Sequence, residues 1–271
     1  MNKEKAKQIA KNTLKIFENG SYHLLDGTKV SVKKLLNQAI RNTIDYTTED
    51  NLYLNDIGFS QKFETKFNVV NSPAIDVALN SQGTATVLNF ASAKSPGGGF
   101  LQGALAQEES LARSSGLYHC LRTSEMYDYH VDQKDPIYSD WIIYTPRVPV
   151  ITNNDGQLLK KPSLVDFITC AAPNATALQS KNDKRDLKEI LEKRIKKILS
   201  VALLQDSQHL ILGAWGCGVF GNDPKLVSGL FHKLLFNEFE GMFPEVTFAV
   251  LDSSEEKYFI SPFEKNFLET K

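Results

Sequence analysis

The sequence predicts an α/β fold in which helices cover both faces of one central sheet, a three-layer α/β/α sandwich. The first observation behind this prediction is that, from about residue 66 onward, short apolar runs typical of strands alternate with longer segments of helical periodicity. The second observation is size, because a chain of 271 residues with 42% hydrophobic residues can bury a sizeable core. We find no internal repeat and no low-complexity segment. One large domain with an extension therefore accounts for the chain.

We predict that residues 1–60 form the mostly helical extension and that residues 61–271 form the main domain. In the extension, apolar side chains recur at helical spacing in two segments, with a hairpin pattern around an Asp-Gly turn between them. The expected elements are a helix within residues 2–18, two short strands within residues 22–30 around Asp26-Gly27, and a helix over residues 31–44.

The main domain is predicted to alternate strands and helices. The expected strands cover residues 67–70, 84–90, 141–144, 166–170, 209–213 and 246–251. The expected helices cover residues 72–79, with Ser72 as the N-cap and Pro73 as the first helical residue, then 108–118, 183–204 and 224–239. The helix over 183–204 has the clearest apolar face, and we expect solvent to cover its basic face, formed by Lys193, Arg194, Lys196 and Lys197.

Composition argues against several classes of protein. The formal charge is −1, so nothing suggests broad electrostatic binding to nucleic acid or to a membrane. No apolar run approaches the roughly 20 residues that cross a bilayer, and the N-terminal segment lacks a secretory signal pattern. The cysteines are three, widely spaced and without a CxxC pair, which is typical of reduced thiols, and the five histidines show no HxxxH pair. We expect a cytoplasmic monomer with no metal or other cofactor, no membrane partner and no sequence-specific nucleic-acid binding.

Ser95–Leu111 is the most informative segment of the chain. Three consecutive glycines, Gly97–Gly99, directly follow a predicted buried strand, and they are followed by Glu108 and Glu109. Glycine has no Cβ and reaches positive φ, so a ligand can press directly against this backbone. Two neighbouring carboxylates that share a pocket ionise together only at a cost in free energy. A shaped loop beside a carboxylate poised for proton transfer suggests hydrolysis.

A second glycine-rich segment, Gly213–Gly221, follows another predicted strand and precedes a helix that begins near Pro224. In α/β sheets, ligands bind at the carboxyl ends of strands, and clustered N–H groups next to a helix N-terminus favour phosphate or diphosphate. Residues 216–221 fit the GxGxxG pattern, but they lie too far along the chain for a dinucleotide fold, and there is no GxxxxGK[ST] segment.

Each of these features also has a purely structural interpretation. An acidic first turn is common because the helix dipole favours it, and glycines are frequent in flexible turns. Pro96 and Phe100, on either side of the triple glycine, argue for a packed loop instead. Phe220 could be a core residue, and Cys217 is expected to be a small residue in a tight loop because no histidine partner is evident. Tyr258-Phe259 could stack on a base, although a core or surface role is the more common one.

Several segments, in this order, resemble the bacterial-type poly(ADP-ribose) glycohydrolases, a branch of the macrodomain superfamily. The family signature is three glycines, a spacer of six to eight residues, and Gln-Glu-Glu. The matching segments are Asn89–Ala93, Gly97–Gly99 with Gln107-Glu108-Glu109, Ser114–Tyr118, Ala171–Asn174 and Leu212–Pro224. The resemblance covers the chain from about residue 60 to its end and implies a macrodomain fold with a mixed central sheet.

The resemblance also implies roles for individual residues. The activity would be cleavage of the glycosidic bond at C1″ of ADP-ribose, with poly(ADP-ribose) on modified macromolecules as the substrate. Glu109 would be the catalytic acid and base, Glu108 would hold ribose hydroxyls, Gln107 would help to position the substrate and Asn89 would bind the distal ribose. The implied ligand-binding backbone is that of Gly97, Gly98 and Gly99 and of the diphosphate loop Gly216, Cys217, Gly218, Val219, Phe220 and Gly221, with Phe220 beside the distal ribose.

The chemistry of the residues agrees with this. Breaking a ribosyl C1″–O bond passes through an oxocarbenium-like transition state, so the leaving oxygen needs a proton from a carboxyl whose pKa is raised by burial and by a neighbouring carboxylate. Inversion and retention are both compatible with these residues. We expect action from the chain end. Two alternatives stay open: hydrolysis of mono-ADP-ribosyl groups on protein or nucleic acid, and non-catalytic reading of ADP-ribose.

Overall fold

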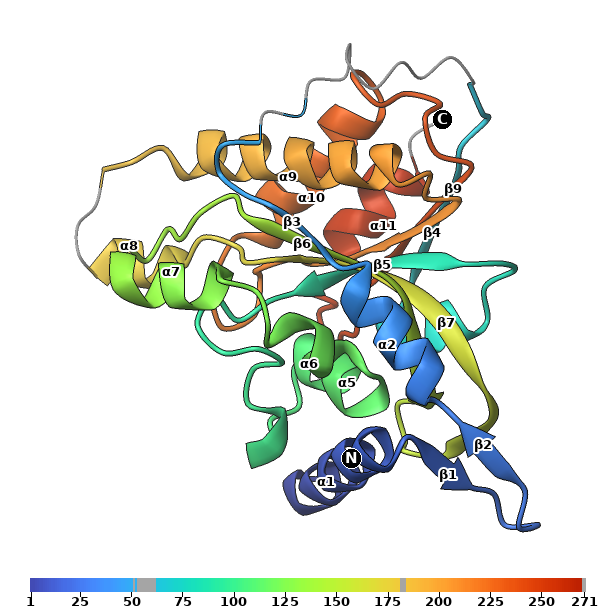
Figure 1. Cartoon of the computed structure of the whole chain (residues 1–271). Helices are drawn as coiled ribbons and strands as arrows, with labels where there is room; N and C mark the ends of the chain where they lie inside the picture. Colours follow the sequence, from blue (N-terminus) through green and yellow to red (C-terminus); the bar gives the residue numbers. More distant parts are fainter. Residues whose placement is uncertain (51, 53–61, 181–183, 270–271) are drawn as a thin grey trace.

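The computed structural model describes residues 1–50, 52, 62–180 and 184–269. Its centre is a seven-stranded mixed sheet with the order β3-β6-β7-β5-β8-β9-β4 (Figure 1). The strands are β3 (Ile44–Tyr46), β4 (Lys66–Val70), β5 (Ala85–Phe90), β6 (Ile142–Thr152), β7 (Leu158–Cys170), β8 (His209–Leu212) and β9 (Glu245–Ala249). β3, β6 and β7 pair antiparallel, and the remaining pairs are parallel.

Strand β5 lies at the middle of this sheet and sets the position of the loops that follow it and its neighbours. It runs parallel to both β7 and β8, with Phe90 opposite Cys170 and Val87 opposite Ile211. The carboxyl ends of these three strands therefore meet at one edge of the sheet. The loops after β5, β7 and β8 all start from that edge, where ligands bind in sheets of this kind.

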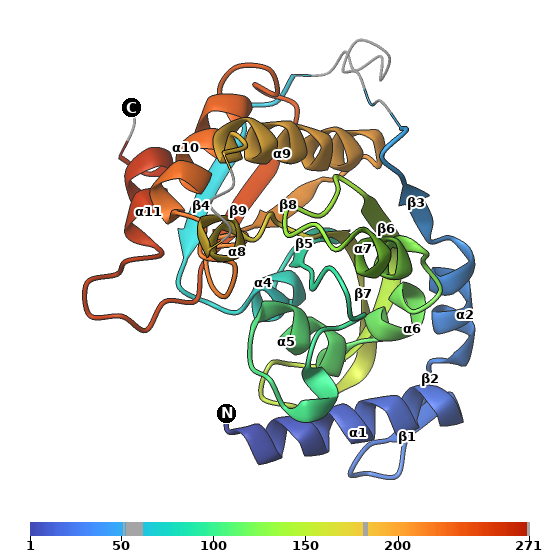
Figure 2. The same cartoon turned by 90° about the vertical axis from the view of Figure 1, so that its left-hand side faces the viewer.

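Helices cover both faces of the sheet, which completes the predicted three layers (Figures 1 and 2). On one face lie α9 (Leu187–Leu204), α10 (Pro224–Leu235) and α11 (Ser261–Phe267). On the other face lie α2 (Lys33–Arg41), α4 (Ala74–Leu79), α5 (Gln107–Ser114), α6 (Leu117–Leu121) and α7 (Met126–Gln133). The short helix α8 (Ala175–Ser180) follows β7. No helix among the described residues is long and apolar enough to span a membrane.

The N-terminal segment packs outside the second helical layer. Helix α1 (Lys3–Asn19) lies against α5 and against the 3₁₀ turn η1 (Phe100–Gln102), as Figures 1 and 2 show. A two-stranded hairpin, β1 (Ser21–His23) and β2 (Lys29–Ser31), follows it with a turn at the predicted place. Strand β3 then pairs with β6 at the edge of the main sheet, so the described part of residues 1–60 contributes a strand to that sheet. The predicted boundary at residue 60 itself lies outside the described residues.

Three local predictions about helices were wrong, each for a tertiary or steric reason. The helix expected over 31–44 ends at Arg41, because Ile44 pairs with Tyr144 as part of β3. Pro73, not Ser72, occupies the N-cap position of α4, so proline precedes the first helical residue. The helix expected over 108–118 breaks at Ser115, whose backbone is extended and bridges to Val150.

The solvent-exposed basic face predicted for 183–204 was wrong at two of its four residues. Asp186 caps α9, and Arg194 and Lys197 are buried on it, only 3% and 7% exposed. Arg194 Nη1 donates to the carbonyl oxygens of Ala171 and Ile137, at 2.7 and 3.1 Å, and Lys197 Nζ donates to the carbonyl oxygen of Thr47. These two side chains therefore donate hydrogen bonds to backbone carbonyl groups of segments that pack against α9.

Candidate active site

Asn89 marks the point where β5 reaches the site. Its side chain is fully buried, and Nδ2 donates to Thr169 Oγ1 of β7 at 3.2 Å and to Glu108 Oε1 at 3.4 Å. Its carbonyl oxygen Oδ1 is buried and has no partner in the described part of the chain. A buried polar atom without a partner costs free energy, so Oδ1 is a natural acceptor for a ligand hydroxyl.

Gln107 joins the start of α5 to the end of β5. Its Oε1 accepts from the N–H of Phe90 at 2.9 Å, and its Nε2 donates to the carbonyl oxygen of Leu88 at 2.8 Å. The amide therefore continues the hydrogen bonding of the strand and fixes where the helix begins. These two hydrogen bonds hold the start of α5, and with it the next two residues, against β5. The part in positioning the substrate that the resemblance implies stays a prediction.

Glu108 is buried in the first turn of α5, with 3% of its surface exposed. Its Oε2 accepts from the N–H of Ser92 at 2.6 Å, and Oε1 faces Asn89. Burial raises the pKa of this carboxyl to about 8, with the charge of Glu109 adding to the rise, while hydrogen bonds from Ser92, Asn89 and Gly97 oppose it. The raised pKa favours the protonated form of Glu108, which can donate a hydrogen bond.

Glu109 differs from its neighbour in how it is held. It is 9% exposed, and its Oε1 accepts from the N–H of Gly99 at 2.9 Å, which leaves Oε2 without a hydrogen-bond donor among the described residues. The close approach depends on Gly98, which has φ of +58°; a Cβ there would lie 2.5 Å from Glu109 Oε1 and 3.0 Å from Glu108 Oε2. The burial of both carboxylates argues against a solvated acidic helix turn.

Helix α1 packs against the loop after β5 and against α5, the helix that carries the two glutamates. Thr13 Oγ1 donates to the carbonyl oxygen of Arg113 in α5 at 2.5 Å. Phe100 packs with Ala10 of α1 and Ala112 of α5 in a small apolar cluster. Gly103 has φ of +80°, and a Cβ there would collide with the backbone of Lys3. The extension therefore fixes the loop and the helix that carry the two glutamates.

The second loop, after β8, has a different hydrogen-bonding pattern. Asn222 Nδ2 donates to the carbonyl oxygens of Gly216 and Pro173, both at 2.9 Å, and Gly216 and Gly221 have positive φ and lie against Ala172 and Thr176. Within the described residues, the backbone N–H groups of Gly218, Val219 and Phe220 donate to no protein acceptor. Three free N–H groups in one turn can bind an anion.

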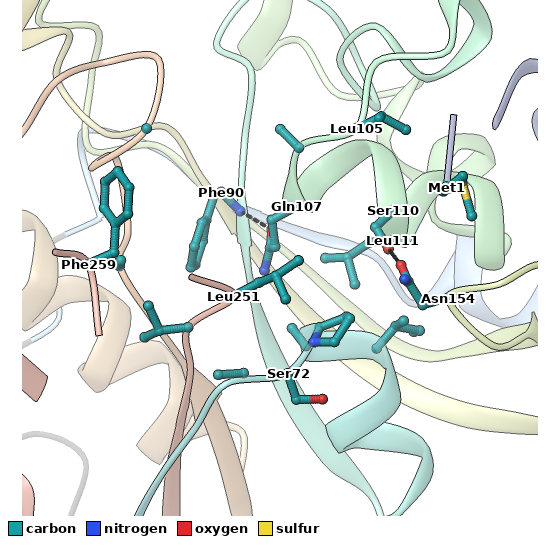
Figure 3. Close-up of a pocket in the computed structure, with 18 of the residues that line it drawn as sticks. Met1, Ser72, Phe90, Leu105, Gln107, Ser110, Leu111, Asn154, Leu251 and Phe259 are labelled. Carbon is teal, nitrogen blue, oxygen red and sulfur yellow. Dashed lines mark hydrogen bonds between the residues drawn. The ribbon is translucent and has the colours of Figure 1, made fainter. Parts of the chain in front are cut away.

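Both loops line one cavity of about 410 Å³ at this edge of the sheet (Figure 3). Phe90 and Gln107 come from the first loop and its flanks, and Ala214 and Gly218 come from the second. Phe259 lies at one end of the labelled side chains, and Met1, Ser110 and Asn154 lie at the other. The volume is in the range of small-molecule sites.

The structure thus joins Asn89 and Gly97–Gly99 to the two glutamates, Glu108 and Glu109, and joins Gln107 to the end of β5. In the second loop it separates the residues by place: Gly218 lines the cavity, Val219 is 86% exposed, and Gly216 and Gly221 shape the turn. Cys217 is buried, its Sγ lies 3.7 Å from the carbonyl oxygen of Trp215, and burial raises the pKa of its thiol to about 12, which disfavours the nucleophilic thiolate.

Sequence reasoning missed several residues of the site. Ser92 donates to Glu108, and its hydroxyl accepts from the N–H groups of Lys94 and Ser95, at 3.4 and 3.2 Å. Arg113 is buried at the cavity one turn after Glu109 and donates to the carbonyl oxygen of Ala104 at 3.1 Å. The spacing of Arg113 from Glu109 was the one available signal, since residues four apart share a helix face. No group of three or more His, Cys, Asp or Glu in the described ranges is arranged to hold a metal ion.

The fold and site define a macrodomain-like α/β protein, and comparison with known proteins gives its family. The model of the microbial-type PARG catalytic domain matches residues 10–153. The crystal structure of poly(ADP-ribose) glycohydrolase from Thermomonospora curvata is similar over 97% of this chain and 100% of its own, with 39% identity and a TM-score of 0.93. The chain belongs to the microbial-type poly(ADP-ribose) glycohydrolase family, and it is a glycohydrolase.

Two further structures have ligands in the same fold. The Thermomonospora enzyme bound to the inhibitor ADP-HPD has 39% identity, a TM-score of 0.89 and the same coverage of 97% and 100%. The enzyme from Deinococcus radiodurans in complex with ADP-ribose has 37% identity and a TM-score of 0.80, and the match covers 85% of this chain and 96% of that one. A comparison with curated proteins gives no match.

Proposed function

We propose that this protein removes ADP-ribose from the end of poly(ADP-ribose) by hydrolysing the ribose–ribose O-glycosidic bond. The single observation that carries the proposal is the pair of buried carboxylates, Glu108 and Glu109, held by the N–H groups of Ser92 and Gly99 beside a cavity of about 410 Å³. The relatives that hold ADP-ribose or an inhibitor support it, as does membership of the family.

The cavity and the second loop suggest how the terminal unit binds. The free N–H groups of Gly218, Val219 and Phe220 would hold the diphosphate, and the distal ribose would reach the acceptor Oδ1 of Asn89. Phe259, which is half-buried at the cavity, would stack on the adenine, whereas its neighbour Tyr258 is 53% exposed. Binding these remote groups orients C1″ at the carboxylates.

The two carboxyl groups would then divide the chemistry. Glu109, with Oε2 free, gives its proton to the leaving oxygen as the C1″–O bond breaks, and it later takes a proton from the attacking water. Burial raises the pKa of Glu108, which favours the protonated carboxyl, so Glu108 can donate a hydrogen bond to a ribose hydroxyl.

Release of ADP-ribose from automodified polymer tests the proposal, with ADP-ribose binding measured by calorimetry on the same samples. Glu109→Gln should lower turnover by about 10²–10⁴-fold and keep ADP-ribose binding, since general acid catalysis contributes that much. Glu240→Gln, a change at an exposed glutamate, is the matched control and should turn over normally. Normal turnover by Glu109→Gln would falsify the role of Glu109.

A comparison of substrates tests which linkage of ADP-ribose the protein hydrolyses. Release from polymer should exceed release from serine-linked, arginine-linked and DNA-linked ADP-ribose. A strict preference for one of the mono-linked substrates would overturn the polymer assignment, and binding without any release would make the protein a reader. Products that contain more than one ADP-ribose unit would contradict action from the chain end.

We also propose that the protein works as a monomer in the cytoplasm. All three cysteines are free thiols in the structure, as is typical of a reducing compartment. Sedimentation of the purified protein and fractionation of cells test the two statements; a dimer mass, or recovery outside the cytoplasmic fraction, would contradict them.

A further inference from the structure

Tyr138 stands out because it is a bulky residue in a backbone conformation that favours glycine. Its φ is +60°, and it lies half-buried in the loop between α7 and β6. Its ring centroid is 5.7 Å from that of Phe220 and 5.6 Å from that of His130. A left-handed conformation at such a residue is unfavourable and persists only where the surroundings impose it.

Three separate elements impose this conformation. Arg194 of α9 donates to the carbonyl oxygen of Ile137 at 3.1 Å, on one side of Tyr138. On the other side, the N–H of Ser139 donates to Nε2 of His130, in α7, at 3.0 Å. The N–H of Asn174, after β7, donates to the carbonyl oxygen of Pro136 at 2.9 Å. The ring of Tyr138 is thus held at a fixed place.

The ring of Tyr138 lies where the chain leaves β5 and β7, next to Phe220 of the loop after β8. Tyr138 packs on the apolar cluster of Ala91, Ala93 and Ala171, at the carboxyl ends of β5 and β7. His130 connects the loop after β5 to the loop that carries Tyr138. Its Nε2 accepts from the N–H of Ser139, so Nδ1 carries the hydrogen and donates to the carbonyl oxygen of Ala93 at 3.1 Å. No hydrogen bond in the described residues engages the hydroxyl of Tyr138.

The order of groups across the site gives the direction of the substrate. Gln107 and Phe90 line the cavity; Glu108 is next to Gln107 and bonds to Ser92; and Ser92 lies between the two alanines on which Tyr138 packs. Neither Tyr138 nor Phe220 lines the cavity, and Tyr138 packs against the segment whose Ser92 holds Glu108, so the ring pair lies outside the cavity and near the carboxylates. If the nucleotide occupies the cavity and C1″ lies at the carboxylates, the ring pair is within reach of the group that leaves C1″.

We propose that Tyr138 is a specificity-determining residue that stacks on the purine base of the leaving ADP-ribose unit. This inference rests on the proposed function, because in poly(ADP-ribose) the leaving group is an ADP-ribose unit that carries an adenosine. A tyrosine ring beside a second aromatic ring offers a flat apolar surface for a planar base, and aromatic–base stacking tolerates any orientation that keeps the planes together.

Three variants test the ring, the hydroxyl and the backbone separately. Tyr138→Ala removes the ring, Tyr138→Phe removes only the hydroxyl, and Tyr138→Gly removes the ring while favouring the positive φ. For the Ala and Gly variants we expect kcat/KM on poly(ADP-ribose) to fall about tenfold or more, mainly through KM, since base stacking accounts for an effect of that size. Tyr138→Phe should stay within about threefold, as should the affinity of every variant for free ADP-ribose, which has no leaving group.

Tyr129→Ala is the matched control. The ring centroid of Tyr129 is 5.7 Å from that of His130, and the ring also contacts Trp141, but it makes no ring contact with Phe220. It should keep the wild-type KM, and Tyr138→Gly should keep the wild-type Tm. Equal losses of ADP-ribose affinity and of polymer turnover would overturn the inference, because Tyr138 would then support the nucleotide side. So would normal turnover by Tyr138→Gly. A wild-type protein that releases nothing from polymer overturns the proposed function before any variant is compared, and this inference with it.

Discussion

The two glycine-rich loops of the active site use their backbone N–H groups in opposite ways. In the loop after β5, the N–H groups of Ser92 and Gly99 donate to the side chains of Glu108 and Glu109. In the loop after β8, the N–H groups of Gly218, Val219 and Phe220 have no acceptor within the described residues. The first loop donates to the protein's own carboxylates, whereas the second loop has N–H groups without a protein acceptor, which we propose hold the diphosphate.

This difference shows that glycine content alone does not indicate a ligand site. Gly98 is needed because two carboxylates lie within 3.0 Å of where its Cβ would be. Gly218 has open space there, with no heavy atom within 4 Å. Gly98 of the first loop makes room for the two carboxylates, and Gly218 of the second leaves its backbone open to a ligand.

The largest contrast should be in activity, between Gly98→Ala and Gly218→Ala. The new Cβ at Gly98 would displace the end of Glu109, and a misplacement of about 1 Å can cost about 10²-fold in rate. The methyl group at Gly218 meets nothing in the protein, so turnover should stay within about threefold unless the ligand itself fills that space. The measurement is kcat on polymer; similar values for both variants would remove the distinction between the loops.

A second contrast concerns pH, because only the first loop surrounds a carboxyl with a raised pKa. Glu108 has a pKa of about 8 in the folded protein against 4.5 ordinarily, so between these values the folded state holds a proton that the unfolded state has lost. Stability from this group is therefore complete below pH 4.5 and falls as pH rises to about 8, by at most about 1.4 kcal/mol per pH unit.

Glu108→Gln should remove this part of the pH dependence. Urea unfolding of wild type and variant at pH 5 and pH 8 measures it, and the difference between the two proteins cancels the other titrating groups. The wild type should lose stability relative to the variant as pH rises. An unchanged difference between pH 5 and pH 8 would show that Glu108 is ionised in the folded protein.

A smaller effect, on the free energy of unfolding, is expected from the contact between α1 and the loop after β5. Gly103→Ala combines positive φ with a collision against the backbone of Lys3, whereas Gly27→Ala has positive φ of +82° and open space. Gly27→Ala should cost about 1–2 kcal/mol from its backbone conformation alone, and Gly103→Ala about 1–3 kcal/mol more. Denaturant unfolding measures both; equal costs would mean that α1 moves away easily.

The smallest effect is expected at Cys217 of the second loop. Its thiol is buried and protonated, so Cys217→Ala should change kcat by less than about twofold and stability by about 1 kcal/mol. A large loss of turnover in the variant, or rapid inactivation of the wild type by iodoacetamide that labels Cys217, would contradict the assignment of that residue to the shape of the loop.

Patterns in the sequence were enough to predict the layers and most of the strands, because both depend on local spacing. Strand β3 was not predicted, since its place depends on a tertiary contact, the pairing with β6. The alternation of short apolar runs with helical segments predicted the sandwich, and the positions of two glycine segments after strands predicted loops at one edge. The division of the chain at residue 60 stays a prediction, as do the roles of the individual site residues.

What the sequence could not show depends on tertiary contacts. The difference between Glu108 and Glu109 comes from Ser92, Asn89 and Gly99, which are distant from them in the chain. The burial of Arg194 depends on two loops that cross α9. Tyr138 could not be predicted because nothing in the residue type indicates a positive φ.

The position of β4 in the sheet has a consequence for how the protein is made. β4 pairs with β9, so Lys66 lies opposite Glu245, and Asn71 Nδ2 donates to the carbonyl oxygen of Asp252, 181 residues away in sequence. At about 5–20 residues per second, roughly 10–35 s of translation separate the two strands. During that interval the ribosome-bound chain has β4 without its partner strand, and Phe67 without the rings of Phe236 and Phe267 on which it packs in the folded protein.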